Sequence, residues 1–188
     1  MEKRTSFLTT QFRAEQEEEQ LFIEGYFIKF NSETELWPGT YEEVAPEAIV
    51  NSLKNGDVRS LFNHDTNLVL GRTGNKTLEL KADDVGLFGK VEINRDDSQA
   101  MDAYYRIKRG DVTGCSFGFY PLNEDFEERS EGGTKYILRE IELFEVSPCV
   151  FPAYPQTEIA ARKKDIAELK REKLDLKKQK LKERIKNG

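Results

Sequence analysis

Three residues of this chain have side chains that together could perform acyl transfer: a histidine, a serine and a glutamate. They are His64, Ser116 and Glu145, and His64 is the only histidine in the sequence. In Ser-His-acid chemistry the serine hydroxyl attacks a carbonyl, the histidine takes its proton, and the acid fixes the histidine tautomer. The sequence around each residue indicates whether it can perform that role.

His64 ends a segment, Val58–His64, whose pattern predicts a buried strand, and Asp65 follows it at a polar turn. A lone histidine is more often structural or exposed, but one at a strand end is held by the sheet and open to a substrate. With one histidine and two cysteines the chain has few of the four ligands that a structural zinc site needs. We therefore expect a catalytic base here, with no metal and no cofactor.

Ser116 lies in the apolar segment GCSFGF, between Gly114 and Gly118. Small neighbours allow a substrate backbone to come close, which favours a nucleophile, although a strand that merely contains a serine is the alternative. The letters match the GxSxG pattern of α/β-hydrolases. The surrounding sequence lacks the strand, turn and long helix of that fold, so we exclude that family.

Glu142 and Glu145 lie on one predicted strand, IELFEVSPCVFPAY, and they face opposite sides because side chains alternate along a strand. A buried acidic side chain needs a partner, and an imidazole that becomes charged is a suitable one. We expect Glu142 to face solvent and Glu145 to pair with the histidine.

The elements that must position these residues are many short strands and two helices, which indicates an α+β or mainly β domain. Ser98 is the expected N-cap of the longer helix and Gly110 its end. The shorter helix begins near Pro46. The predicted strands around the site are Leu21–Phe30, Val58–His64 and Thr134–Phe151. The predicted helices are Pro46–Gly56 and Ser98–Gly110.

The charge divides the chain into two parts. The whole chain has 29 basic and 35 acidic residues; Ala161–Gly188 has 12 basic and 5 acidic, which leaves 17 and 30 for the rest. We expect a domain over residues 1–155 and a charged helical tail over 156–188. The acidic body argues against nucleic acid as the main ligand, because phosphate contacts need clustered Lys and Arg. No apolar run suggests a signal peptide or a membrane span, so we expect a cytoplasmic protein.

Five segments, in this order, resemble the prohead protease family of tailed phages, which is similar to the herpesvirus assemblins. The resemblance covers nearly all of Leu21–Tyr154. The segments are FIEGYFIKFNSET, YEEVAPEAIVNSL, SLFNHDTNLVLGRTGNKTLELKADDVGLFGKVEI, TGCSFGF and ELFEVSPCVFPAY.

The resemblance implies that Ser116 is the nucleophile and His64 its base, with Glu145 where assemblins carry a second histidine. It implies a small antiparallel β-barrel ringed by helices, here followed by the charged C-terminal helix. The implied function is a serine endopeptidase that cleaves scaffold or capsid-protein N-terminal segments, and itself, inside the assembling prohead. A homodimer is also implied, since related assemblins are activated by dimerisation.

Two rival hypotheses remain open at this point. A cysteine protease could use Cys115 or Cys149, although Cys115 is next to Ser116 on a strand and must face the other way. A non-enzymatic scaffold or interaction protein of the procapsid is the second alternative. Self-shortening of the purified protein separates the enzyme from the scaffold.

Overall fold

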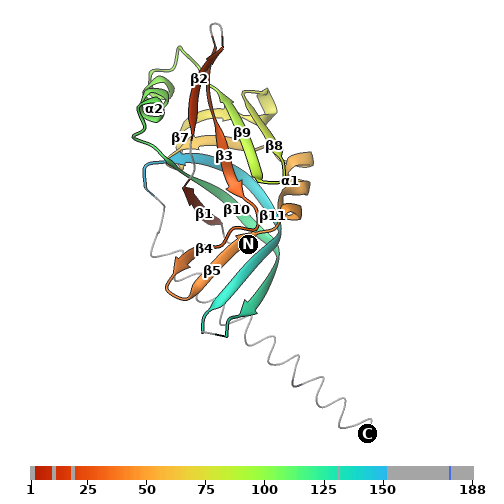
Figure 1. The fold of residues 1–188 in the computed structure, drawn as a ribbon. Helices are drawn as coiled ribbons and strands as arrows, with labels where there is room; N and C mark the ends of the chain where they lie inside the picture. Colours follow the sequence, from red (N-terminus) through yellow and green to blue (C-terminus); the bar gives the residue numbers. More distant parts are fainter. Residues whose placement is uncertain (1–2, 10–11, 18–19, 131, 152–177, 179–188) are drawn as a thin grey trace. The chain divides into compact units, whose positions relative to one another are not determined.

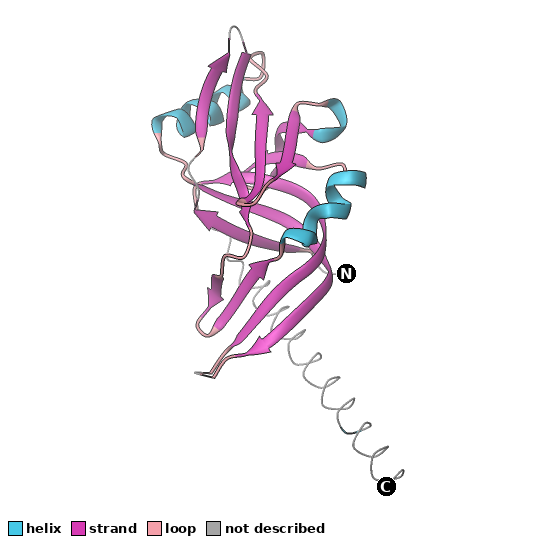
Figure 2. Ribbon diagram, turned by 45° about the vertical axis from the view of Figure 1, so that its right-hand side comes forward, coloured by secondary structure: helices cyan, strands magenta, loops and turns pink. Residues whose placement is uncertain are grey.

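A computed structural model describes residues 3–9, 12–17, 20–130, 132–151 and 178 of the 188. Strands dominate these residues, and the helices lie at the periphery (Figure 2). The strands are β1 Arg4–Thr9, β2 Arg13–Glu17, β3 Gln20–Lys29, β4 Thr34–Trp37, β5 Thr40–Val44, β6 Arg59–Phe62, β7 Asp65–Arg72, β8 Leu78–Ala82, β9 Gly86–Glu92, β10 Gly114–Glu128 and β11 Thr134–Cys149.

Both helices predicted from the sequence are present. The shorter is a 3-10 turn that continues into an α-helix, and the longer ends at Gly110, whose φ of 87° a glycine adopts without strain. The prediction that Ser98 caps the longer helix is wrong. The side chain of Asp97 accepts hydrogen bonds from the backbone N–H groups of Gln99 and Ala100 instead. The helical elements are η1 Pro46–Ile49, α1 Val50–Asn55, η2 Thr73–Asn75 and α2 Ser98–Arg109.

The strands form two open sheets (Figure 1). One has the order β1-β10-β11-β5-β4, with β6 joined to β11 and β7 to β6, and the other has the order β2-β3-β9-β8. The α+β class with many strands is confirmed, but the expected closed antiparallel barrel is wrong for the described residues. Strand β11 pairs with both β5 and β6 in parallel, so the larger sheet is mixed.

The long hairpin of β10 and β11 is the backbone of the larger sheet. Along β10, the side chains of Cys115, Phe117 and Phe119 enter the core, where they meet residues of β3 and β11. Residues of β10 between them, Ser116 and Gly118, therefore face the other side of the sheet. Alternation along this one strand thus separates the packing residues from the candidate nucleophile.

Two strands that follow each other closely in the sequence lie in different sheets. Segments LVLGRT and TLELKA are strands β7 and β8, but β7 pairs with β6 and β8 with β9, in different sheets. The amino-terminal segment also contributes to both sheets, through β1 and β2. A hydrophobic pattern in the sequence indicates where strands lie but does not identify the strands with which they pair.

The predicted charged helix over residues 156–188 lies outside the described residues, apart from Lys178, and it stays a prediction together with the domain boundary at 155. Within the described part of the chain, no helix combines the length and the apolar character that crossing a membrane requires.

The cap at Asp97 can be tested by substitution. We expect Asp97→Ala to lower the free energy of unfolding by about 1 kcal/mol, because two backbone N–H groups of the first turn lose their acceptor. Ser98→Ala, at an exposed neighbouring position, should change it by less than about 0.5 kcal/mol. Urea denaturation followed by circular dichroism measures both. A larger loss for Ser98→Ala would contradict this assignment.

Candidate active site

His64 lies in a two-residue turn between β6 and β7. Phe62 and Asp65 pair across this hairpin, and Asn63 and His64 between them have positive φ angles of 54° and 60°. Both angles are positive in a type I′ turn, whose twist matches that of the flanking strands. Asparagine and histidine tolerate this left-handed region better than most residues do. The turn therefore holds the imidazole at a fixed point beside the sheet.

Asn63 ties this turn to the end of β11. Its backbone N–H donates to the carbonyl of Pro148 over 3.0 Å, and its side-chain oxygen accepts from the backbone N–H of Val150 over 2.9 Å. These bonds join the turn to the strand that carries Glu145. The distance between the histidine and the glutamate is thus set by backbone contacts and not by side chains alone.

The imidazole of His64 makes a hydrogen bond with the carboxyl group of Glu145. The distance from Nδ1 to Oε1 is 2.5 Å, and the exposed fractions of the two side chains are 15% and 2%. A carboxylate accepts, so Nδ1 carries the proton of the neutral ring and Nε2 has the free lone pair. Nε2 is buried and has no hydrogen-bond partner among the described residues. This arrangement prepares Nε2 to act as a base.

Register between β10 and β11 brings the remaining polar groups to the same face. Ser116 is paired with Ser147, and Gly118 is paired with Glu145. Paired residues of antiparallel strands point to the same side of the sheet, so the serine and the glutamate share one face. His64 reaches this face through its bond to Glu145.

The hydroxyl of Ser116 is engaged with the amino-terminal strand. It donates to the backbone carbonyl of Ser6 over 2.5 Å, and Ser116 has 0% of its surface exposed. Strand β1 pairs along β10 with Phe7 opposite Ser116. No hydrogen bond joins Ser116 to His64 among the described residues. The structure thus unites His64 with Glu145, and it places Ser116 on their face with its hydroxyl turned to β1.

Burial separates the two candidate glutamates. Glu142, opposite Tyr120, is exposed, whereas Glu145 is buried. The exposure of Glu142 and the burial of Glu145 agree with the expectation, but its basis, simple alternation, is wrong. A register shift leaves Phe144 without a partner on β10, so Glu145 and Glu142 lie opposite Gly118 and Tyr120, which share one face of that strand. Sequence reasoning missed Ser147 and the turn residue Asn63. The signal for Ser147 was its spacing of two residues from Glu145, which puts both on one face of a strand.

Neither cysteine is suited to be the nucleophile. Cys115 is fully buried and its Sγ lies 3.4 Å from the carbonyl oxygens of Tyr26 and Phe27, on the face opposite Ser116. Cys149 lies on the same face as Glu145, but burial and the neighbouring Glu145 charge raise its pKa to about 12. At neutral pH its thiol stays protonated, and only the thiolate is a good nucleophile.

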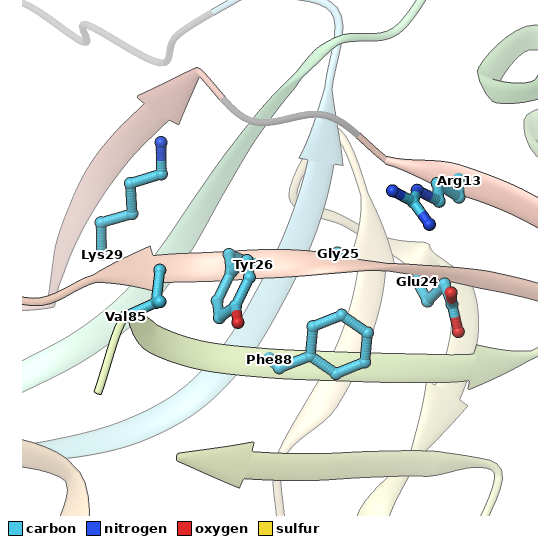
Figure 3. Close-up of a pocket in the computed structure, with 7 residues that line it drawn as sticks. All are labelled: Arg13, Glu24, Gly25, Tyr26, Lys29, Val85 and Phe88. Carbon is cyan, nitrogen blue, oxygen red and sulfur yellow. The ribbon is translucent and has the colours of Figure 1, made fainter. Parts of the chain in front are cut away.

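A groove of about 580 Å³ lies elsewhere, on the smaller sheet (Figure 3). Tyr26 and Phe88 form its floor as an edge-to-face pair, and Arg13 and Lys29 flank it. None of the candidate catalytic residues lines this groove. Among the described residues, no three His, Cys, Asp or Glu side chains gather as metal ligands would.

Comparison with known proteins relates this chain to phage proteases. The family described as caudovirus prohead serine protease matches residues 9–172. The prohead protease of Enterobacteria phage HK97 is 31% identical over 165 residues, which cover 86% of this chain and 68% of that protein. The solved capsid assembly protease of bacteriophage T4 has a TM-score of 0.49 at 13% identity, over 79% of this chain and 99% of that one.

The raised pKa of Cys149 predicts its reactivity. At pH 8 we expect iodoacetamide to leave the folded protein unmodified and to add to both cysteines after denaturation in urea, as read by intact mass. Cys149→Ala identifies which thiol reacts. Rapid modification of Cys149 in the folded protein would reopen the cysteine-nucleophile hypothesis.

Proposed function

This chain belongs to the caudovirus prohead serine protease family, and from that premise we propose that Ser116, His64 and Glu145 form the catalytic triad of a serine endopeptidase. The observation that carries the proposal is the hydrogen bond between Nδ1 of His64 and the buried carboxyl of Glu145. It fixes the tautomer that leaves the lone pair on Nε2, the atom that would act as the base.

In the first half of the reaction, Oγ of Ser116 attacks the carbonyl carbon of a peptide bond while its proton passes to Nε2 of His64. Glu145 accepts from Nδ1–H and stabilises the imidazolium that results, without taking the proton itself. The tetrahedral intermediate then collapses. Nε2–H gives its proton to the departing amine as the C–N bond breaks, which leaves the substrate acyl group on Ser116.

In the second half a water molecule replaces the amine. Its proton passes to Nε2 while its oxygen bonds to the acyl carbon, and the ester bond to Ser116 then breaks. Oγ recovers its proton from His64, so the enzyme returns to its starting state. Each turnover consumes one peptide bond and one water, and it requires no cofactor.

The proposed substrates are segments of the scaffold or of the capsid protein, cut inside the assembling prohead in the host cytoplasm. The support is the family and the similarity to a phage prohead protease. The basic segment over Ala161–Gly188 is a further proposed substrate, by self-cleavage, because it is rich in polar charged residues. A partnership with a second copy of the chain stays a prediction.

The contact between Ser116 and Ser6 sets one condition on this mechanism. The hydroxyl that must give its proton to His64 donates instead to a carbonyl of β1, and β1 covers the edge of β10 beside it. Ser116 must leave that carbonyl before it attacks. The family match begins at residue 9, at the end of β1.

Substitution of the nucleophile tests the function. The wild-type chain, incubated for a day with its capsid and scaffold proteins, should clip them or shorten itself, as followed by intact mass. Ser116→Ala should reduce cleavage by several orders of magnitude, because the acyl-enzyme cannot form. His64→Gln should do the same, and Cys115→Ala should retain cleavage. If wild type leaves every protein intact in assembled proheads, the scaffold alternative replaces the protease.

Removal of β1 tests the condition on Ser116. A variant without residues 1–9 should react faster with a fluorophosphonate at Ser116 than the full chain does, because the covering strand and the Ser6 carbonyl are gone. The rate of adduct formation by mass measures this, and Ser116→Ala in the shortened chain is the control. Equal rates in the two lengths would show that β1 does not restrain the serine.

A further inference from the structure

We propose that Ser147 is a positioning residue that holds the Glu145 carboxyl in the orientation that His64 requires. This inference rests on the proposed function, because it assigns a role within the same triad. Ser147 does not touch the reacting atoms in this scheme. It acts through Glu145, which acts in turn on the histidine.

The hydroxyl of Ser147 donates to Oε2 of Glu145 over 2.6 Å. The other oxygen, Oε1, faces Nδ1 of His64. Each carboxyl oxygen thus has its own partner: Ser147 comes from β11 itself, and His64 from the turn between β6 and β7. Ser147 itself has 0% of its surface exposed, so water does not replace it in this bond.

Glu145 needs this second partner because little else in its surroundings satisfies a buried carboxylate. Arg59 is its neighbour in register on β6, but its guanidinium group bonds to Asp57. Cys149 has a protonated thiol and brings no positive charge. The recorded ionic partner of Glu145 is His64, which is charged only while it carries the extra proton. A hydrogen bond from Ser147 therefore supports the carboxylate while the imidazole is neutral.

Gly118 explains how the carboxyl group can lie where Ser147 reaches it. A Cβ atom at this position would lie 2.5 Å from Oε1 of Glu145 and 2.8 Å from its Cγ. The side chain of Glu145 thus lies across the backbone of β10, in space that only a glycine leaves open. The glycine makes the room, and the hydroxyl of Ser147 fixes the rotation of the carboxyl within it.

The terminal torsion of a glutamate is broad, so a carboxyl without the Ser147 bond turns more freely. Nδ1 of His64 then loses a fixed acceptor, and the imidazolium that forms in the transition state loses stabilisation. Because Ser147 acts in this scheme through Glu145 and His64 and not on the bound substrate, its loss should lower kcat with little change in KM. A hydrogen bond to a charged group corresponds to a decrease in kcat of about ten- to a hundred-fold.

The single histidine gives a direct test, because the far-downfield proton NMR signal of a hydrogen-bonded Nδ1–H can come only from His64. Three substitutions at 147 are compared in the full chain. Ser147→Ala removes the hydroxyl. Ser147→Thr and Ser147→Val have nearly the same shape and differ in the hydroxyl alone, so any cost of added bulk cancels between them.

Ser60→Ala is the matched control. Ser60 is also a buried serine, on the neighbouring strand β6, and its hydroxyl has no hydrogen-bond partner among the described residues. Ser60→Ala removes a hydroxyl group from an equally buried serine and leaves the hydrogen bonds of Glu145 in place. Signal and kcat should both stay at the wild-type level in this variant.

The expected result is a displaced or exchange-broadened His64 signal in Ser147→Ala and Ser147→Val, and a wild-type signal in Ser147→Thr. The substrate for the activity assay is a peptide copied from the site that the wild-type protein cuts. On this peptide kcat should fall in Ser147→Ala and Ser147→Val and stay near the wild-type value in Ser147→Thr. The proposal is overturned if Ser147→Ala keeps both signal and kcat, or if the Thr and Val variants behave alike.

Two further outcomes separate this proposal from the triad on which it rests. The NMR signal is read without substrate, so it tests the hydrogen bonds between Ser147, Glu145 and His64 even if the wild-type protein cleaves nothing. A lack of cleavage by wild type would count against the proposed function alone. If Ser116→Ala still cleaves and Ser147→Ala does not, Ser147 is itself the nucleophile and the positioning role is wrong.

Discussion

The buried carboxyl group of Glu145 is the constraint on which the rest of the site depends. Placing a carboxylate inside a protein costs several kcal/mol unless partners satisfy it, and here a histidine and a serine each take one oxygen. Ser147 lies two residues further along the same strand, whereas His64 is brought by the fold from 81 residues away. A structure that satisfies Glu145 therefore also positions His64.

Strand β11 is central because it joins all these groups. One of its edges pairs with β10, which carries Ser116, and the other pairs in parallel with β6, which leads into the turn that carries His64. The bond from Asn63 to Pro148 fixes that turn against the same strand. A closed antiparallel barrel is not required for this, because one long strand with different partners on its two edges joins His64 to Glu145 and carries Ser116 on a neighbouring strand.

The sequence predicted the elements of this site better than their pairing. The expectation of Glu142 outside and Glu145 inside was right, but the alternation behind it is broken by a register shift at Phe144 that no local sequence signal marked. The glycines around Ser116 were enough to favour a close approach of backbone. The partner of Ser116 could not be predicted, because Ser6 lies 110 residues away and nothing local marks the contact. The cap at Asp97 was missed because Asp97 and Ser98 are both good capping residues, and only backbone geometry decides between them.

The state of the site also follows from its hydrogen bonds. Nε2 of His64 is buried without a partner among the described residues, and an unsatisfied buried acceptor costs about 1–3 kcal/mol. In the proposed mechanism Nε2 bonds the hydroxyl of Ser116, but that hydroxyl donates to the Ser6 carbonyl. While β1 is in place, a Ser116–His64 hydrogen bond would therefore form only at the expense of the Ser116–Ser6 bond. Once β1 leaves, water can satisfy the Ser6 carbonyl, and the exchange no longer costs a bond. The same displacement opens the edge of β10, where an extended peptide could pair beside Ser116. In the proposed mechanism, release of the hydroxyl and admission of a substrate would be consequences of one movement, because β1 both pairs with the edge of β10 and bonds the Ser116 hydroxyl.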